Sequence, residues 1–414
     1  MKSQKIIISA IDIVEIIENE SEDNYCQYLF NGKPINELTN IESETSIREK
    51  ENELISAIVN NFIRDQFENT LILTGAGASI IGFDKKYEGY SGKTVGGLTK
   101  VIDDYLKETT SVYSLEELSK IINYFSDHKE YNLNEVNIED LLSKAESAKD
   151  YLNLDIDTKF NKTIEEIEKQ IMQQCNIALH PEHTHRLFLN KIILRRKTHN
   201  RVKIFTTNYD TLIEQAAEKE GFLLIDGFSY NFPRTFNSYN FDIDFVRRDD
   251  TRFLEEPDYL EKVIHLYKLH GSVDWERVDN KIVKTEKPRK PLMIYPRKNK
   301  YEKSYEPPYF EMFSRFQYEL RKRNTLLITI GFSFADKHIR TIVENAIINN
   351  PSIKLLIVDV DISQDNYSFF RKRALEGYQN IMLYKSNFSQ FAKIYLEQKA
   401  YSQNFFENLG GKNE

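Results

Sequence analysis

Five apolar, β-favouring runs of the chain each end in small or polar residues. They read LILTGAGAS at 71–79, VKIFTTNYD at 202–210, VIHLYKLHGS at 263–272, LLITIGFSF at 326–334 and LLIVDVD at 355–361. Segments with helical spacing lie between or after these runs, and Gly221 is expected to end one of them. Continuous apolar strands that alternate with helices predict an α/β fold with a Rossmann-like, mostly parallel sheet.

Two other regions differ from this alternation. In residues 98–200, apolar positions recur every three and four residues, which predicts a helical subdomain inserted after the first sheet strand. Residues 1–60 combine a β-branched run with a charged helical stretch and carry no recognisable chemistry. We expect them to form a small N-terminal appendage for packing or assembly. The main domain is then expected at 61–390, followed by a C-terminal helix or tail at 391–414.

The composition is typical of a soluble globular protein. The 414 residues are 40% hydrophobic and 29% charged, which is enough for a sizeable core in two or three domains. A net charge of -8 argues against global attraction to nucleic acid. No apolar run reaches the ~18 residues that span a bilayer, and the N-terminus lacks the apolar stretch of a signal peptide. We expect a cytoplasmic protein that contacts no membrane and does not bind nucleic acid directly.

The first run ends in a glycine loop, Gly75 to Ser79. Glycines let backbone N–H groups approach a pyrophosphate, and the N-terminus of a following helix favours its negative charge. The dinucleotide fingerprint is incomplete, because Ile80 stands where a third glycine is usual, and no Gly-Lys-Ser/Thr of a phosphate-binding loop follows. A tight turn from strand to helix is therefore the alternative to a phosphate site.

Polar groups follow the other strands as well. In open α/β sheets ligands bind outside the carboxyl ends of the strands, so that these groups are expected to converge on one crevice. Asn208 and Asp210 follow the second run, where capping of a helix is the alternative role. His270 follows the third, with Gly271 allowing close approach, and a purely structural histidine is the alternative. Gly331-Phe332-Ser333 repeats the small-residue ending.

Taken together, these motifs resemble the sirtuin superfamily, in the bacterial branch of sirtuin-like domains found in phage-defence proteins. The resemblance rests on TGAGAS, TTNYD, LHGS and GFSFADKHI in that order, with support from NIEDLLS, IYPRKNKYEKSYEPPYFEMFSRF and VDVD. It extends over roughly residues 70–390 and implies a sirtuin-type fold that binds NAD. The motifs are more specific for the fold and for NAD binding than for the reaction.

The resemblance assigns roles to residues of this chain. It implies that Asn208 contacts the nicotinamide ribose, that Asp210 lies near the nicotinamide, and that His270 is the general base. It implies that the remaining contacts to the NAD pyrophosphate and riboses come from Gly75, Ala76, Gly77, Ser79, Thr207, Gly331, Ser333 and Asp359. Asp361 is the alternative to Asp359 at the adenosine ribose.

Two departures from the sirtuin pattern bear on the reaction. Deacylating sirtuins usually carry a zinc ribbon of two cysteine pairs after the His-Gly motif, whereas the only cysteines here are Cys26 and Cys175. No zinc is therefore expected, and the peptide clamp that the ribbon helps to form is in doubt. The usual Gly-Ile-Pro-Asp-Phe-Arg sequence is also absent, and IIGFDKKYEGYSGK stands in its place. Without an acyl-lysine in the site, water becomes the acceptor.

The expected function is hydrolysis of NAD⁺ to nicotinamide and ADP-ribose. The resemblance further implies a defence effector that depletes NAD⁺, a homo-oligomer, and a HerA-type ring ATPase as partner. Two rival functions stay open. One is a zinc-free NAD-dependent deacylase. The other is a sensor that binds NAD or an ADP-ribose derivative without turnover, although a pure binder needs neither Asn208 nor His270.

Two further stretches offer competing signals. HPEHTHR at 180–186 is either a metal cluster or the start of a helix, and its histidine spacing of three and two does not fit one helix face cleanly. The basic run KPRKPLMIYPRKNK at 287–300 either meets a polyanion or forms a solvated face, which is the usual fate of charge runs.

Overall fold

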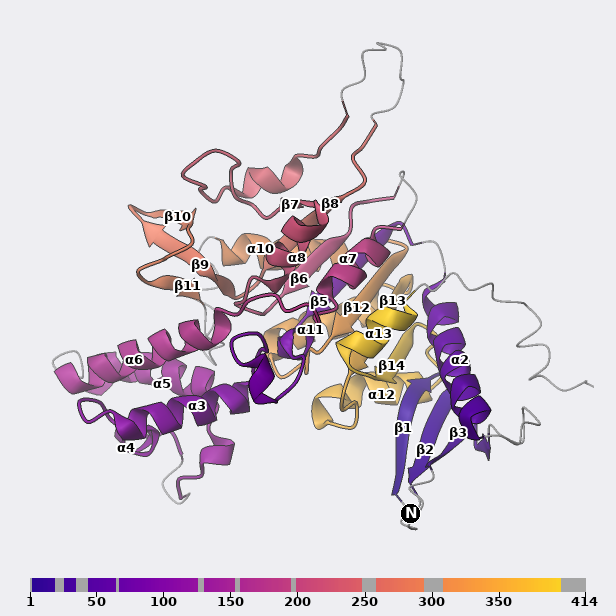
Figure 1. The fold of residues 1–414 in the computed structure, drawn as a ribbon, viewed down its shortest axis with the longest axis horizontal. Helices are drawn as coiled ribbons and strands as arrows, with labels where there is room; N and C mark the ends of the chain where they lie inside the picture. Colours follow the sequence, from indigo (N-terminus) through magenta and orange to yellow (C-terminus); the bar gives the residue numbers. More distant parts are fainter. Residues whose placement is uncertain are drawn as a thin grey trace, which may run out of the picture. The chain divides into compact units, whose positions relative to one another are not determined.

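The chain divides into two compact units. The computed structural model describes residues 2–18, 26–34, 44–64, 67–125, 130–152, 157–194, 199–247, 258–293 and 308–395. Unit 1 is formed by residues 1–73, 186–202 and 317–414, and unit 2 by residues 74–185 and 203–316. Most helices and strands of both units are labelled in Figure 1.

Unit 1 is built on strands in the order β4-β3-β2-β1-β14-β13-β12-β5. Their bounds are β1 (Lys2–Ser9), β2 (Ile13–Glu18), β3 (Cys26–Phe30), β4 (Lys33–Pro34), β5 (Asn69–Thr74), β12 (Thr325–Ile330), β13 (Ile353–Asp359) and β14 (Ile381–Lys385). β12, β13 and β14 are parallel, and every side chain of β12 is buried, as expected for strands covered on both faces. β1 pairs antiparallel with β14, so that the N-terminal strands extend this sheet.

The helices of unit 1 are α2 (Glu44–Ile63), α7 (His185–Ile192), α11 (Lys337–Asn349), α12 (Ser368–Leu375) and α13 (Phe388–Ile394), with the 3₁₀ turn η6 (Asp365–Tyr367). α11 begins at a cap, where the Asp336 carboxylate accepts from the His338 backbone N–H at 2.9 Å. The ring of Phe188 in α7 packs edge-on against that of Phe388 in α13, with centroids 5.2 Å apart.

Unit 2 contains a parallel sheet and a small antiparallel one. The parallel sheet has the order β6-β8-β7, with bounds β6 (Lys203–Thr206), β7 (Leu223–Ile225) and β8 (Val263–Lys268). The antiparallel sheet has the order β10-β9-β11, with bounds β9 (Gly271–Val278), β10 (Lys281–Lys284) and β11 (Pro291–Met293). Between β6 and β7 runs α8 (Leu212–Glu220), which ends as predicted at Gly221 in the left-handed conformation.

The remaining helices of unit 2 pack around their own apolar core. They are α3 (Val95–Glu108), α4 (Leu115–Ile121), α5 (Ile138–Leu152) and α6 (Thr158–Cys175). Ile102, Leu141 and Ile167 are fully buried in this core. Short 3₁₀ turns are η1 (Ala76–Ser79), η2 (Lys85–Tyr87), η3 (Leu133–Glu135) and η5 (Ser238–Asp242), and α10 (Tyr309–Leu320) crosses the boundary between the units.

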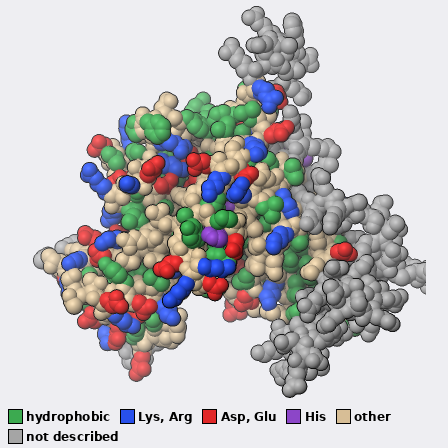
Figure 2. Space-filling view, viewed as in Figure 1, with side chains coloured by type: hydrophobic (Ala, Val, Ile, Leu, Met, Phe, Trp, Pro, Cys, Tyr) green, Lys and Arg blue, Asp and Glu red, His purple; other side chains and the backbone are tan. Residues whose placement is uncertain are grey.

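The predicted fold class, α/β with a mostly parallel Rossmann-like sheet, is confirmed, and each of the five predicted strands is present. The C-terminal helix α13 begins at Phe388, and residues 396–414 lie outside the described part of the chain, as do residues 294–307. In the described ranges, no helix combines the length and the apolar character that crossing a membrane requires. On the face shown in Figure 2, basic and acidic side chains are interspersed.

Candidate active site

The glycine loop is a tight turn directly after β5. The Ala78 backbone N–H donates to the Gly75 carbonyl at 2.9 Å, which closes the 3₁₀ turn η1. The α-helix expected to follow at once is absent, which corrects that prediction: the next α-helix begins only at Val95. Instead the chain folds back against the glycine loop at Gly92, whose N–H donates to the Ser79 carbonyl at 2.8 Å. A Cβ at Gly92 would lie 2.7 Å from the Ser79 Cβ, so the close approach requires glycine.

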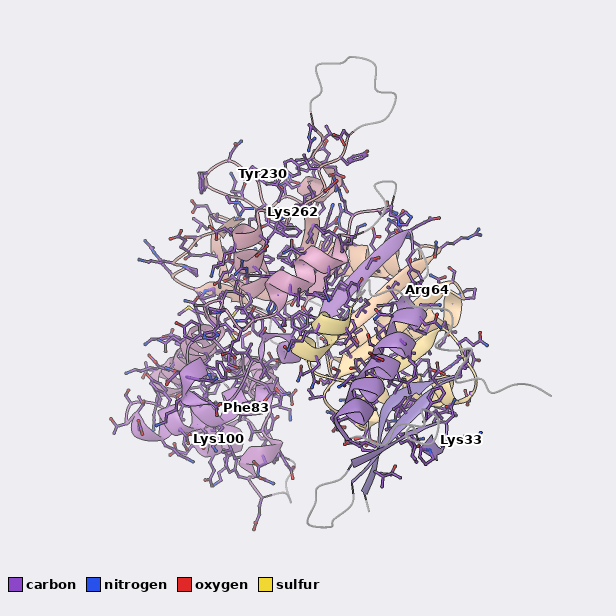
Figure 3. The ribbon with its side chains drawn as sticks, turned by 45° about the vertical axis from the view of Figure 1, so that its right-hand side comes forward. Lys33, Arg64, Phe83, Lys100, Tyr230 and Lys262 are labelled. Atoms are coloured by element: carbon purple, nitrogen blue, oxygen red, sulfur yellow. The ribbon has the colours of Figure 1, made fainter. Side chains whose placement is uncertain are left out.

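The segment between this turn and α3 contains the stretch IIGFDKKYEGYSGK, residues 80–93. It includes η2 and presents Phe83, whose side chain is 89% exposed and is labelled in Figure 3. The Tyr87 hydroxyl is hydrogen-bonded to Glu182, and the Tyr87 ring meets His180 edge-on. The segment is thus held against the HPEHTHR stretch of the same unit.

Asn208 and Asp210 are joined to the glycine loop by side-chain hydrogen bonds. Asn208 Nδ2 donates to the Gly75 carbonyl at 2.9 Å and to Ser79 Oγ at 2.8 Å. Ser79 Oγ in turn donates to Asp210 Oδ2 at 2.6 Å. The other carboxylate oxygen of Asp210 accepts from Leu212 N–H at 3.1 Å, at the start of α8. Asp210 therefore serves both the helix start and the polar cluster, and one role does not exclude the other.

His270 lies at the end of β8 and is buried, with 4% of its surface exposed. Its ring lies between two aromatic side chains, with centroid distances of 6.5 Å to Tyr209 and 6.5 Å to Phe313. Gly271 has φ 86°, and a Cβ there would meet the Leu292 carbonyl oxygen at 2.1 Å. Only glycine fits this position, as the predicted close approach requires.

The loops that carry Asn208 and His270 are joined backbone to backbone. Leu269 N–H donates to the Thr206 carbonyl at 2.8 Å, and Val273 N–H donates to the Tyr209 carbonyl at 3.0 Å. The same carbonyl accepts from Ser272 Oγ at 3.2 Å. These bonds join the loop of Asn208 and Asp210 to the loop of His270 at the carboxyl ends of β6 and β8.

Thr207 and Glu139 connect this cluster to neighbouring segments. Thr207 N–H donates to the Thr74 carbonyl at 3.1 Å, so that the loop continues the pairing of its strand toward the glycine loop. Glu139, at the start of α5, accepts from the Tyr209 hydroxyl at 3.0 Å. The NIEDLLS motif therefore supports the residue between Asn208 and Asp210, a role that the sequence pattern alone did not reveal.

Gly331, Ser333 and Asp359 belong to unit 1. Gly331 follows β12 with φ 57°, and Asp359 ends β13. The Asp359 side chain is buried and accepts from Asp361 N–H at 3.0 Å, and burial raises the pKa of its carboxyl. A hydrogen bond from Ser363 lowers the pKa of Asp361. These residues lie at strand ends as predicted, and their joint action with the cluster of unit 2 stays a prediction.

The histidines of HPEHTHR lie just before α7 and at its first residue. His183 Nδ1 accepts from His180 N–H at 2.8 Å, and the rings of His183 and His185 are 5.5 Å apart. Burial lowers the pKa of His183 and lowers that of His185 to about 3, which keeps both rings neutral. Among the described residues, no group of three or more His, Cys, Asp or Glu side chains is arranged to hold a metal ion.

Comparison with known proteins gives one family. The family described as "SIR2-like domain" matches residues 202–377, which include Asn208, Asp210, His270 and the strand ends of unit 1 but not the glycine loop. Residues 202–377 are thus similar to the SIR2-like domain. A solved structure titled "The Structural basis of Sirtuin Substrate Affinity" is 12% identical, with 83% of this chain and 98% of that chain covered and a TM-score of 0.36. No curated protein matches the chain.

Proposed function

We propose that this protein is an NAD⁺ hydrolase that releases nicotinamide and ADP-ribose. The observation that carries the proposal is the hydrogen-bonded cluster of Ser79, Asn208 and Asp210, joined through its backbone to the loop of His270. The match of residues 202–377 to the SIR2-like domain supports NAD-related chemistry at these loops. A simple helix cap or a structural histidine would not need the additional side-chain hydrogen bonds among Ser79, Asn208 and Asp210.

The chemistry follows from the groups present. The bond from the ribose C1′ to the nicotinamide nitrogen breaks with its electron pair leaving on nicotinamide, through an oxocarbenium-like ribose. The Asn208 amide orients the ribose or the attacking water, and Asp210 lies on the nicotinamide side. The imidazole of His270 accepts a proton from the water or from a ribose hydroxyl as the new C–O bond forms. Product ADP-ribose carries the water oxygen at C1′.

Water is the proposed acceptor because the chain offers no zinc ribbon to help hold an acylated peptide. No cysteine follows Cys175, and burial raises the pKa of that thiol, which keeps it protonated and disfavours metal binding. NAD⁺ is thus the substrate, and no zinc is assigned to the reaction.

The proposed setting is a defence effector that acts by depleting NAD⁺, as a homo-oligomer with a HerA-type ring ATPase. The support is the sirtuin-like pattern of the sequence, so that assembly needs its own test. Light scattering should use the full chain, because removing β1 would expose β14. An oligomer at micromolar concentration is expected, and a monomer under those conditions would count against this part of the proposal.

The test of the reaction is incubation of the purified chain with NAD⁺, followed by chromatography of nicotinamide and ADP-ribose, with and without an acetyl-lysine peptide. We expect equal release of both products without the peptide. Strict dependence on the peptide, with a deacetylated product, would instead establish a deacylase. Binding of NAD⁺ without any turnover would establish a sensor. Asn237→Ala, which removes the side-chain cap of η5, is a matched control for Asn208→Ala.

A further inference from the structure

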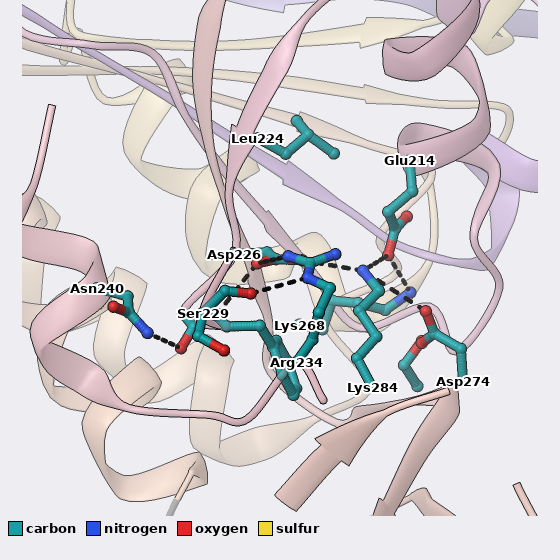
Figure 4. A network of polar contacts seen from close by, with 12 residues as sticks. Glu214, Leu224, Asp226, Ser229, Arg234, Asn240, Lys268, Asp274 and Lys284 are labelled. Carbon is teal, nitrogen blue, oxygen red and sulfur yellow. Dashed lines mark hydrogen bonds and ion pairs between the residues drawn. The ribbon is translucent and has the colours of Figure 1, made fainter. Parts of the chain in front are cut away.

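Unit 2 contains a largely buried network of charged side chains, shown in Figure 4. We call it the charged network, and its members are Glu214, Asp226, Arg234, Lys268, Asp274 and Lys284. It contains three cations and three carboxylates, all from unit 2, and its acids come from α8, the end of β7 and β9. Buried ionic groups are costly unless they are paired, so that this balance of charge is what makes the network tolerable.

At one end of the charged network, Lys284 is paired with carboxylates. Lys284 Nζ lies 2.9 Å from Asp226, 3.5 Å from Asp274 and 3.9 Å from Glu214. Burial opposes its charge, but these carboxylates outweigh burial and raise its pKa, so the ammonium stays ionised. In the described part of unit 2, the Lys284 ammonium makes no polar contact with the loops of Asn208 and His270.

Lys268 differs from Lys284 in what its ammonium contacts. Its side chain is 3% exposed, and Nζ lies 3.2 Å from Glu214. The ammonium also donates to the backbone carbonyl of Asp210 and, at 3.5 Å, to that of Tyr209. An ammonium has three donors, and in this buried position they are satisfied only while residues 209 and 210 keep the observed conformation.

Those two carbonyls belong to the loop that sets the proposed catalytic groups. The Asp210 side chain accepts from Ser79 Oγ, which accepts from the Asn208 amide. Lys268 itself ends β8, two residues before His270. A single buried side chain therefore links the segment of the proposed base to the segment of the amide and carboxylate.

We propose that Lys268 is a positioning residue for NAD⁺ cleavage. It holds the 208–210 loop in the position where the Asn208 amide and the Asp210 carboxylate face the ribose and the nicotinamide. The effect of Lys268 on catalysis rests on the proposed function. The effect of Lys268 on the order of the 208–210 loop does not depend on that function. A misplacement of about 1 Å in such groups costs about 10²-fold in rate.

The test compares two matched double variants, K268M/E214Q and K284M/D226N. Each variant removes one buried ammonium and neutralises the carboxylate nearest to it. In both variants this carboxylate is therefore not left buried with an unpaired charge. Turnover is corrected for folded protein by the fluorescence of Trp275, which is the single tryptophan and is buried in β9. We expect K268M/E214Q to lose about 10²-fold in kcat while KM for NAD⁺ stays near the wild-type value. K284M/D226N is expected to keep the wild-type kcat.

Hydrogen exchange of the amides at 207–212 gives a second readout that needs no turnover. It should quicken in K268M/E214Q and stay unchanged in K284M/D226N. Equal kcat losses in both variants, or wild-type kcat in K268M/E214Q, would overturn the proposal. If the wild-type chain proves not to cleave NAD⁺, the proposed function fails. Unchanged exchange at 207–212 in K268M/E214Q would then also overturn the role of Lys268, whereas quickened exchange would retain it as the residue that orders the loop.

Discussion

The strand ends of the two units differ in the long-range hydrogen bonds that their side chains make. In unit 2, the side chains at the strand ends bond over long distances in sequence: Asn208 reaches Gly75, 133 positions away, and Ser79 reaches Asp210, 131 positions away. In unit 1, the Asp359 carboxylate accepts from the backbone N–H of Asp361, two positions along. Asp commonly forms local turns of this kind, whereas long-range bonds among an amide, a hydroxyl and a carboxylate indicate a built site.

The difference separates two kinds of contribution to NAD⁺ cleavage. The cluster of unit 2 contains every group that we assign to bond breaking, and it is rigid because its loops bond to each other. The strand ends of unit 1 offer Gly331, Ser333 and Asp359, which the sirtuin-like pattern assigns to binding. Substitutions of Asn208, Asp210 or His270 in unit 2 are therefore expected to change kcat, and those of Gly331, Ser333 or Asp359 in unit 1 to change KM.

The largest effect is expected for the two groups that act on the ribose and the water. Asn208→Ala and His270→Ala should each lower kcat by about 10²–10⁴-fold, since they remove positioning and general base catalysis. His270 is buried, so rates must be compared per folded molecule. The measurement is nicotinamide release at saturating NAD⁺, with circular dichroism to confirm the fold.

The comparison fails if His270→Ala cleaves NAD⁺ at the wild-type rate, because the base would then be another group. His183 is the first alternative to examine. It is buried near Ser79, and burial lowers its pKa, so its ring is neutral at pH 7.

A smaller effect is expected at the end of β13. Asp359→Asn keeps an oxygen that can accept from the Asp361 N–H, so that the local turn survives while the negative charge is lost. If Asp359 binds the adenosine ribose, KM for NAD⁺ should rise several-fold with kcat close to wild type. Steady-state kinetics measures both constants. A kcat loss as large as that of Asn208→Ala would erase the distinction between the units.

The smallest effect concerns stability in acid. Burial lowers the pKa of His185 to about 3, below its ordinary value of 6.5, so the unfolded chain binds a proton more readily than the folded one. Stability from the neutral ring is therefore complete above about pH 6.5 and is lost as the pH falls toward 3. His185→Phe should flatten the decline between pH 7 and pH 5, measured by urea unfolding. An unchanged decline would show that folding does not lower the pKa of this ring.

The sequence was informative wherever local pattern decides structure. The apolar runs predicted five of the strands, and Asn208, Asp210 and His270 became candidate site residues because they are polar residues that follow these strands. The pairing of β1 with β14 was not predicted, because strands almost 380 positions apart share no local signal. The 3₁₀ turn after Gly75 was missed because small residues suit a tight turn and a helix start alike.

The charged network shows a third limit. Lys268 reads in the sequence as a single charge in an apolar strand, and its partner Glu214 lies 54 positions earlier on a helix. Only their meeting in space reveals that the charge is buried and paired. The hydrogen bond between Tyr209 and Glu139 is a similar case, because it joins two sequence motifs that give no sign of each other in the sequence.

The central claim is that Asn208 and His270 act as one site in unit 2, and a double-mutant cycle on NAD⁺ cleavage tests it most directly. The measurement is kcat/KM for nicotinamide release, without any acylated peptide, in the wild type, the two single alanine variants and the double variant. Groups that act as a unit are non-additive, so the double variant should lose much less than the product of the single losses. Strictly multiplicative losses, or a wild-type rate in either single variant, would contradict the account.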